Sequence, residues 1–447
     1  MSGKAKKENL LTSWKDIASY FDCDVRTCQR WEIKYHLPVH RIDETSSSRV
    51  YAYGDELERW FESRFDKKHI PERVSYKKFR WYKSYYFLLA FIAIILIYFF
   101  LIKPSKSQNP ADFKIENSSL IVLNENGQEL WRYDTGIKNI CDEKYYKKRF
   151  QIKEVMEEDS SRTLPHLIIK DLNGNGNREV LFCVQTKSQF ESSEILCFSE
   201  KGTLLWNKTT GREIKYGPKI YSPDYNFKGI LVDDMDRNGK QEIIVIANNT
   251  PFFPTQLLLL NSEGEILGEY WNSGRISDVV FLDLNNDGRK EIIIAGINNE
   301  YHKGFLAVFS SNLVRGGSPQ KEDYYTCADL EPGTEKYYIL IPRTDVSLLE
   351  FVQEAVFQLN VLKNKRLSIL TSPSIVYFEF DYNLEIQEAR LSTAFEALNK
   401  KLVSEGKVNR VLDEEYRKNL ARGLLYYDGK NWVSHHAINM NWKNQEN

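Results

Sequence analysis

Three segments of the sequence place oxygen-bearing side chains at the same spacing. They read DLNGNGNRE at residues 171–179, DMDRNGKQE at 234–242 and DLNNDGRKE at 283–291, and they share the pattern D-x-[DN]-x-[DN]-G-x-x-E. Asp and Asn oxygens at positions 1, 3 and 5 can converge on one point when the glycine at position 6 allows a sharp turn. Hard cations such as calcium prefer oxygen ligands in this arrangement. The pattern therefore predicts three cation-binding loops.

The residue three positions beyond each motif excludes the EF-hand. An EF-hand loop needs a bidentate Glu at position 12, whereas position 12 is here Phe182, Val245 or Ile294. The acidic residue at position 9 is expected to close each loop instead. The motifs begin 63 and 49 residues apart, and such a period is typical of β-propeller blades.

A second repeated element supports the same architecture. An apolar strand, a glycine turn and another strand recur at 123–131, 198–206 and 260–267, and each predicts a β-hairpin. Each cation motif also runs straight into an apolar strand. Loop, strand and hairpin in repetition predict a β-propeller, in which each blade buries its faces against its neighbours.

These repeats resemble the FG-GAP/VCBS family of integrin-α-like propellers over roughly residues 115–309. The resemblance implies up to three structural calcium ions, one pinning each loop, and no catalytic duty. The first loop departs most from the family pattern because it has one Asp, so weak or no binding is expected there. The implied ligands are Asp171, Asn173, Asn175 and Glu179 in the first loop, Asp234, Asp236, Asn238 and Glu242 in the second, and Asp283, Asn285, Asp287 and Glu291 in the third.

The repeat pattern is weaker beyond residue 310. A terminal hairpin around Asp428-Gly429 is a candidate to close the ring of blades with the first strand. The elements predicted in this region are strands at 337–341, 351–359 and 375–380, helices at 391–404 and 412–421, and the hairpin at 425–433.

A different pattern occupies the N-terminal residues. Ser13 is placed to cap a first helix, and Asp24 to cap a second helix from Val25 to about Lys34. On a helical wheel Val25, Cys28, Trp31 and Tyr35 share one face, and Arg26, Arg30 and Lys34 share the opposite, cationic face. Two short helices joined by a tight turn form a helix-turn-helix skeleton, whose second helix enters the major groove of DNA. Strands at 39–42 and 49–53 around a turn at 43–48 fit a wing, and a third helix is predicted at about 55–64.

Residues 11–64, and above all the V-R-T-x-Q-R-W stretch at 25–31, resemble the winged helix-turn-helix of the excisionase and MerR-type class. The resemblance implies sequence-specific DNA binding. The alternative is that this fold binds a protein, because Asp22, Asp24 and Glu32 lower its positive charge. A single N-terminal domain of this kind, called the head below, should bind DNA weakly and with strong salt dependence, so dimerisation is expected. The residues expected at DNA are Arg26, Thr27, Gln29 and Arg30 at base edges and nearby phosphates, Lys34 on the same face, and Arg41, Ser47, Ser48 and Arg49 on the flanking backbone.

Eighteen consecutive uncharged residues, 85–102, separate the two patterned regions. A helix of that length, at about 1.5 Å per residue, matches the ~30 Å hydrocarbon core of a bilayer. The alternatives are a buried core helix, which would show a polar stripe, and a signal peptide, which would not follow so long a polar segment. Lys and Arg residues crowd the N-terminal side of the run, so the positive-inside rule places the N-terminus in the cytoplasm.

Composition agrees with two different environments. Residues 1–83 carry 18 Lys and Arg against 13 Asp and Glu, whereas the remainder carries 43 against 49. A basic head and an acidic body indicate different partners. The mean hydropathy of −0.49 excludes a multi-span membrane protein. Cys23 and Cys28 would be cytoplasmic and reduced, while Cys183 and Cys197 lie in successive apolar strands and could either pair or remain buried thiols.

The sequence thus predicts a multidomain chain with a small α+β winged helix-turn-helix, a single transmembrane helix and a mainly-β propeller with a few C-terminal helices. The expected division is a disordered N-terminus (1–10), the winged helix-turn-helix (11–66), a basic juxtamembrane linker (67–84), the span (85–102), a linker (103–112) and the propeller with its helices (113–447).

The leading hypothesis is a one-component transcriptional regulator in the cytoplasmic membrane, with DNA bound inside the cell and an unknown ligand or protein bound by the exported propeller. The alternative is a surface adhesion or scaffold protein whose cytoplasmic head binds a protein partner. A third, weaker hypothesis makes the propeller a hydrolase or quinoprotein. No HExxH, GxSxG or phosphate-cradling glycine loop occurs, so we expect no enzymatic activity.

Overall fold

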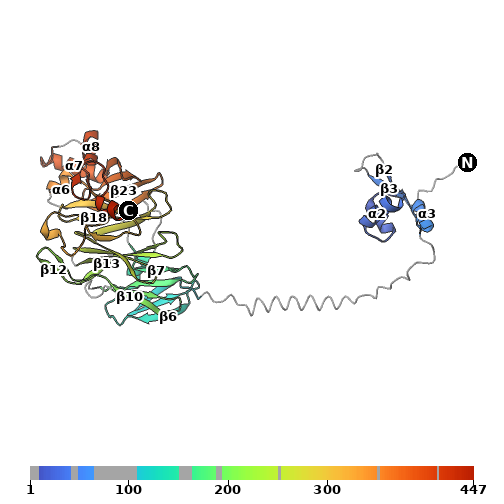
Figure 1. Ribbon diagram of the computed structural model, residues 1–447, viewed down its shortest axis with the longest axis horizontal. Coiled ribbons are helices and arrows are strands. Elements are labelled where there is room, and N and C mark those ends of the chain that lie inside the picture. Colours follow the sequence, from blue (N-terminus) through green and yellow to red (C-terminus); the bar gives the residue numbers. More distant parts are fainter. Residues whose placement is uncertain are drawn as a thin grey trace. The chain divides into compact units, whose positions relative to one another are not determined.

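The chain divides into two units, residues 1–103 and 104–447, in a computed structural model of the full sequence. The structure describes residues 10–41, 49–64, 108–150, 164–187, 194–249, 253–349, 353–409 and 412–446. Figure 1 shows the described part of the first unit in blue and the second unit from cyan to red. Each unit has its own hydrophobic core.

Short helices and a small antiparallel sheet make up the described part of the first unit. Helix α1 (Trp14–Tyr20) begins after Ser13, whose hydroxyl accepts a hydrogen bond from Asp16 N at 3.2 Å. Helix α2 (Val25–Tyr35) begins after Asp24, whose carboxylate accepts one from Thr27 N at 2.9 Å. Both caps satisfy backbone donors that a first helical turn leaves unpaired. The other elements are β1 (Leu10–Leu11), β2 (His40–Arg41) and β3 (Val50–Tyr53), paired in the order β1-β3-β2, and helix α3 (Gly54–Arg64).

The core of the first unit follows the predicted faces with one correction. Ile17, Cys28 and Leu57 are fully buried. Tyr35, which the helical wheel placed on the buried face of α2, is instead 36 % exposed. It is the last residue of the helix, and the chain turns away directly after it because His36 adopts a left-handed φ of 53°. The predicted wing turn at 43–48 and residue 42 lie outside the described residues.

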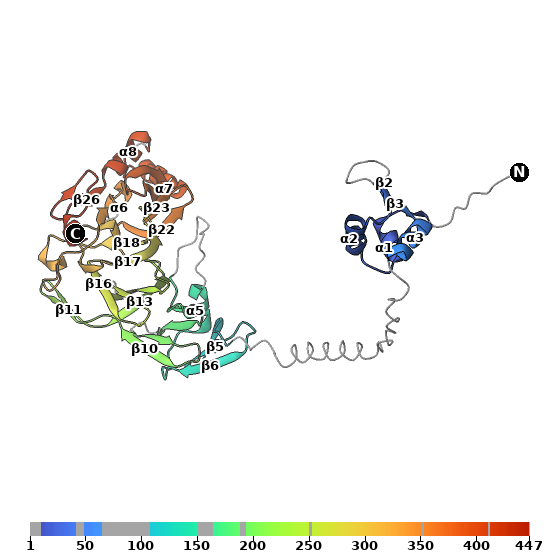
Figure 2. The same ribbon diagram turned by 45° about the vertical axis from the view of Figure 1, so that its right-hand side comes forward.

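The second unit is a series of antiparallel sheets whose strands are mostly consecutive in the sequence (Figure 2). A two-stranded ribbon of β11 (Ile214–Tyr216) and β12 (Lys219–Tyr221) lies between the second and third of these sheets in the sequence. The sheets are, in order, β4 (Asp112–Glu116), β5 (Ser119–Leu123) and β6 (Glu129–Asp134); β7 (Leu167–Lys170), β8 (Glu179–Cys183), β9 (Glu194–Phe198) and β10 (Leu204–Thr209); β13 (Tyr225–Asp233), β14 (Glu242–Asn249), β15 (Thr255–Leu260) and β16 (Ile266–Asn272); β17 (Ile276–Leu282), β18 (Glu291–Asn298), β19 (Lys303–Phe309) and β21 (Tyr337–Leu340); and β22 (Ala355–Leu362), β23 (Arg366–Ser372), β24 (Val376–Asp381) and β25 (Ile386–Leu391).

Four hydrophobic cores of this unit lie between successive sheets, and a fifth packs the β11–β12 ribbon against the third sheet. The first joins Phe113 to Phe182, and the second joins Leu181 to Ile243. The next two continue from the third sheet to the fourth and from the fourth to the fifth. Inner strands such as β18 are buried at every residue because both of their faces are covered. Stacked antiparallel sheets of this kind form the propeller-like, mainly-β fold that the repeats predict.

The fourth sheet corrects the predicted closure of the ring. Strand β20 (Arg315–Gly317) leaves it and pairs in parallel with β16 of the third sheet. The terminal hairpin of β26 (Leu425–Tyr427) and β27 (Trp432–Val433) extends the fourth sheet, through pairing of β26 with β21, and does not pair with the first strand. The backbone of β21 takes this partner because Tyr426, 3 % exposed, packs into the core of the fourth and fifth sheets.

The C-terminal elements lie close to their predicted places, with shifted ends. Helix α7 (Thr393–Ser404) begins after the Ser392 cap, so Leu391 ends β25 and does not belong to the predicted helix. Helix α8 (Glu414–Arg422) begins after the Asp413 cap. Strand β22 begins at Ala355, later than predicted, and residues 350–352 lie outside the described residues. Helices that the sequence did not indicate are α5 (Glu143–Phe150), the 3-10 helix η1 (Asp323–Tyr325), α6 (Asp345–Leu349) and α9 (Met440–Glu446), and strands β23 and β25 of the fifth sheet were not indicated either.

Two sequence expectations concern the membrane and the cysteines. Among the described residues, no helix has the length and apolar character needed to cross a bilayer. The run 85–102 lies outside the described residues. All six cysteines are free, and Cys183 and Cys197 are both fully buried thiols.

Candidate cation loops and nucleic-acid interface

The three motif loops share one hydrogen-bond pattern. The position-1 carboxylate accepts a hydrogen bond from the position-6 glycine N, at 2.7 Å for Asp171 and at 3.0 Å for Asp234 and Asp283. The position-3 side chain accepts from the N of position 5, and the position-5 side chain from the N of position 7. Asn and Asp suit these places because their short side chains bond to backbone N–H groups two residues onward. The motif therefore shapes its own loop.

The position-9 glutamates close the loops, as the sequence predicts. Glu179, Glu242 and Glu291 each accept a hydrogen bond through Oε2 from the N of position 2, at 2.8, 2.8 and 2.9 Å. All three are buried, with 3, 8 and 6 % exposure. Burial raises the pKa of each of these carboxyls. A cation bound beside them would oppose that rise by favouring the ionised form.

The second loop brings all three of its motif carboxylates together. Oxygens of Asp234, Asp236 and Glu242 all lie within 4.8 Å of one another. Calcium is bound at about 2.3–2.6 Å from each oxygen, so ligands facing each other across the ion lie roughly 5 Å apart. The donor set and spacing of this loop fit calcium, and Asn238 adds a further amide oxygen.

The first and third loops differ from the second in charge. In the first loop Asn173 Nδ2 donates to Glu179 Oε1 at 2.9 Å, so an amide takes the place that Asp236 has in the second loop. In the third loop the carboxylate of Asp283 lies 3.8 Å from Nη2 of Arg237, a residue of the second loop. The described geometry does not place three carboxylates of either loop close together.

The loops form a continuous row. Gln241 N donates to Leu172 O at 2.8 Å, and Lys290 N donates to Met235 O at 2.9 Å, so each later loop is bonded to the loop before it. The loops also approach closely, because a Cβ on Gly174 would lie 2.6 Å from Gly239 O. This row was not deduced from the sequence, although the equal position of the bonding residues in each motif could have indicated it.

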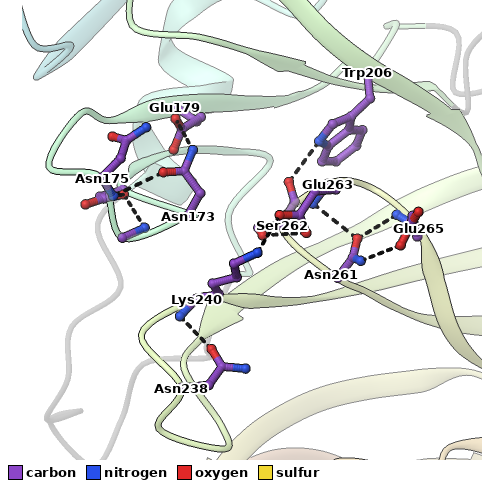
Figure 3. A network of polar contacts seen from close by, with 12 residues as sticks. Asn173, Asn175, Glu179, Trp206, Asn238, Lys240, Asn261, Ser262, Glu263 and Glu265 are labelled. Atoms are coloured by element: carbon purple, nitrogen blue, oxygen red, sulfur yellow. Dashed lines mark hydrogen bonds and ion pairs between the residues drawn. The ribbon is translucent and has the colours of Figure 1, made fainter.

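The predicted hairpins form a second set of contacts between sheets. Trp131 Nε1 donates to Glu200 O, and Trp206 Nε1 to Ser262 O, both at 3.0 Å. Each indole ring also covers the turn glycine of the next hairpin, since a Cβ on Gly264 would lie 2.5 Å from the Trp206 ring. Figure 3 shows Trp206 at this hairpin and Lys240 of the second loop reaching Glu263, with a Nζ–Oε1 distance of 2.9 Å.

The cationic face predicted on α2 is exposed. Arg26, Gln29, Arg30 and Lys34 all lie at the surface, and Ile33 between them is 80 % exposed. Ile33 was not among the residues expected at DNA, although on a helical wheel this residue falls between Gln29 and Arg26 and therefore lies on the same face. An apolar side chain at such a place suits a thymine methyl group.

Two of the predicted DNA-contacting residues have partners within the first unit. The hydroxyl of Thr27 donates to Asp24 Oδ2 at 2.8 Å and therefore belongs to the helix cap. Arg41 pairs with Glu32 at 2.6 Å. Arg49 is exposed, and Ser47 and Ser48 lie outside the described residues.

No protein-family model and no curated protein matches the sequence. Solved structures with a similar fold include the Dos1 propeller, at 8 % identity over 62 % of this chain and 65 % of that chain, with a TM-score of 0.31. BBS1N in complex with ARL6DN gives 9 % identity, coverage of 64 % and 69 %, and a TM-score of 0.31. The rhamnogalacturonan lyase YesW gives 12 % identity, coverage of 60 % and 49 %, and a TM-score of 0.30. The chain thus spans less than two thirds of the Dos1 propeller and about half of YesW.

Proposed function

We propose that the chain is a membrane-anchored one-component transcriptional regulator whose N-terminal winged helix-turn-helix binds DNA in the cytoplasm. The observation that carries the proposal is α2, a capped helix with one buried face and an exposed face of Arg26, Gln29, Arg30 and Lys34. A helix with these properties can lie in the major groove, where Arg and Gln side chains bond to base edges.

The rest of the chain would connect this head to the exported space. Residues 85–102 would form a single span, with the N-terminus in the cytoplasm and the second unit outside. The second unit would bind an unknown ligand or protein, and ligand-driven pairing of two chains is the simplest way for one span to transmit a signal. The Arg41–Glu32 pair would have to open if Arg41 is to contact the DNA backbone.

Calcium would stabilise the second unit rather than react. Its strongest site would be the second loop, where Asp234, Asp236 and Glu242 lie together. Binding there would offset repulsion among carboxylates, which costs the folded state free energy in the absence of a cation. No catalytic role is proposed for any of these residues.

The DNA-binding proposal is tested with the full chain in lipid nanodiscs. Genomic fragments are selected by binding and then footprinted, first with the parent and then with the double variant Arg26→Ala, Arg30→Ala. We expect a discrete footprint that the double variant loses. Arg59→Ala is the matched control, since Arg59 is a 73 % exposed cation on α3 paired only weakly with Asp55. Equal binding of all fragments by parent and variant would contradict the proposal and favour the adhesion or scaffold alternative.

A further inference from the structure

A small cavity lies in the second unit where the chain crosses from the fourth sheet to the third and back. Its volume is about 180 Å³, and its walls include Tyr216, Tyr325, Tyr427, Ser318, Gln320 and Gly333. Pockets for drug-sized ligands span roughly 300–1,000 Å³. The cavity would therefore hold only a small molecule.

A buried carboxyl lies directly behind one wall of this cavity. Glu335 is 0 % exposed, and neither carboxylate oxygen has a hydrogen-bond partner among the described residues. A Cβ on Gly333 would overlap Glu335 Oε2, so the carboxyl contacts Gly333 and no side chain separates the two. Buried polar groups in folded proteins are nearly always hydrogen-bonded. The position of Glu335 therefore calls for a partner that approaches past Gly333.

We propose that this cavity binds a small organic cation with a primary ammonium group, which donates hydrogen bonds to the Glu335 carboxylate. An ammonium has three donors and no acceptor, and it matches a carboxylate that has no donor of its own. The faces of Tyr216, Tyr325 or Tyr427 could attract the same cation. This inference rests on the proposed function only in treating the amine as the ligand of the exported second unit. Amine binding itself does not depend on DNA binding.

The ionisation state of Glu335 allows a second measurement, the release of a proton on amine binding. A purely structural role of Glu335 would not produce that release. Burial raises the pKa of Glu335 to about 8, so the carboxyl is protonated in the free protein at pH 6.5. The other titratable groups that face it are the phenols of Tyr270, Tyr338 and Tyr427, and burial raises the pKa of all three. Binding of an ammonium would ionise Glu335 and release its proton to the buffer.

The test is calorimetric titration of the full chain in nanodiscs with calcium held constant. The probes are ethanolamine and butylamine, and the matched controls are ethylene glycol and butanol. We expect the amines to bind and the alcohols to give no heat. In two buffers of different ionisation enthalpy, about one proton should be released per amine at pH 6.5, and much less at pH 8.5, where the amines are still charged.

Two variants distinguish the effect of the Glu335 carboxyl on amine binding from the effect of negative charge elsewhere on the second unit. Glu335→Gln should weaken amine binding at least tenfold and abolish proton release. Glu388→Gln removes an exposed carboxylate of β25, outside the lining of the cavity, and should leave both almost unchanged. If Glu335→Gln fails to fold, Tyr325→Ala in the cavity wall should weaken amine binding instead.

Several results would overturn the inference. These are equal binding of amines and alcohols, undiminished binding by Glu335→Gln, absence of binding by the parent, or displacement of the amine by magnesium, which would indicate a metal site. Failure of the DNA footprint would leave the amine result intact, because the two assays use different residues and readouts.

Discussion

Arg237 connects two neighbouring candidate cation loops and should influence their relative affinity for calcium. Its guanidinium belongs to the second loop but lies 3.8 Å from Oδ2 of Asp283, the position-1 carboxylate of the third loop. The pair is partly exposed, and such pairs are worth about 0.2–1 kcal/mol. A calcium ion in the third loop would have to compete with this cation. The second loop should therefore bind calcium more tightly than the third.

Replacing Arg237 should strengthen calcium binding by the third loop. In Arg237→Gln the competing charge is absent, and we expect affinity there to rise about two- to fivefold, the equivalent of the pair's free energy. Calorimetric titration of the full chain with calcium measures this, and Asp283→Asn identifies which binding step belongs to the third loop. Lys215→Ala, which removes an exposed cation from β11, is the control. Unchanged or weaker binding in Arg237→Gln would refute the competition.

Glu335 should make the second unit lose stability as the pH rises. Burial raises its pKa from 4.5 to about 8, so its contribution is fully present below pH 4.5 and is lost as the pH rises towards 8. The free energy of unfolding should fall within that window by on the order of 1.4 kcal/mol per pH unit at most. Glu335→Gln should flatten the curve of unfolding free energy against pH, whereas Glu388→Gln should preserve it. Calcium is kept constant because the buried loop glutamates shift in the same direction.

At the scale of elements, the tryptophan contacts between hairpins should stabilise the packing of each sheet on the next. Trp206 both donates to Ser262 O and covers Gly264 of the following hairpin. The third hairpin has no tryptophan at this place, and there β16 pairs with β20 instead. The first three junctions between sheets thus each have a contact of their own.

Removal of Trp206 should weaken the second unit measurably. Trp206→Ala should lower the free energy of unfolding by about 2 kcal/mol, below the roughly 3–5 kcal/mol of a fully buried aromatic because this ring is only partly buried. Leu205→Ala is the matched control, since the neighbouring side chain is 50 % exposed and should cost little. Denaturant unfolding of the full chain measures both. Equal effects of the two variants would show that the indole contact has no special role.

The loops could be predicted from the sequence because their hydrogen bonds are local, whereas one hairpin could not. Residues 380–386 repeat the turn of the other hairpins, with Asp381 Oδ1 accepting from Asn383 N and Glu385 N. The place of the glycine is taken by Leu384 at a φ of 61°. A left-handed residue costs about 1–2 kcal/mol, but Leu384 is 0 % exposed, and burial offsets that cost. The carboxyl of Glu335 also escaped prediction, because its complete burial comes from tertiary packing, which no local sequence pattern indicates.

On the scale of the whole molecule, the chain has two units with separate cores, and the proposed function gives each unit a different partner. The basic residues lie in excess in 1–83 and the acidic residues in the remainder, so each part suits a different partner. Under the proposed function, one head offers few contacts to DNA, and its affinity should depend strongly on salt. Pairing of two chains would then decide whether an operator is occupied.

Two heads held in one bilayer should prefer paired half-sites at a fixed spacing. Once the footprint defines a half-site, the full chain in nanodiscs that contain two copies is titrated with duplexes bearing one half-site or two. Two half-sites 10–10.5 base pairs apart lie on the same face of DNA, and linkage of the heads should tighten binding by about 10²–10⁴-fold. The slope of log affinity against log salt should also become about twice as steep, since twice as many phosphates are contacted. A duplex with five base pairs inserted between the half-sites puts them on opposite faces and is the control. If that duplex binds as tightly as the in-phase one, the heads act independently and ligand-driven pairing cannot be the signal.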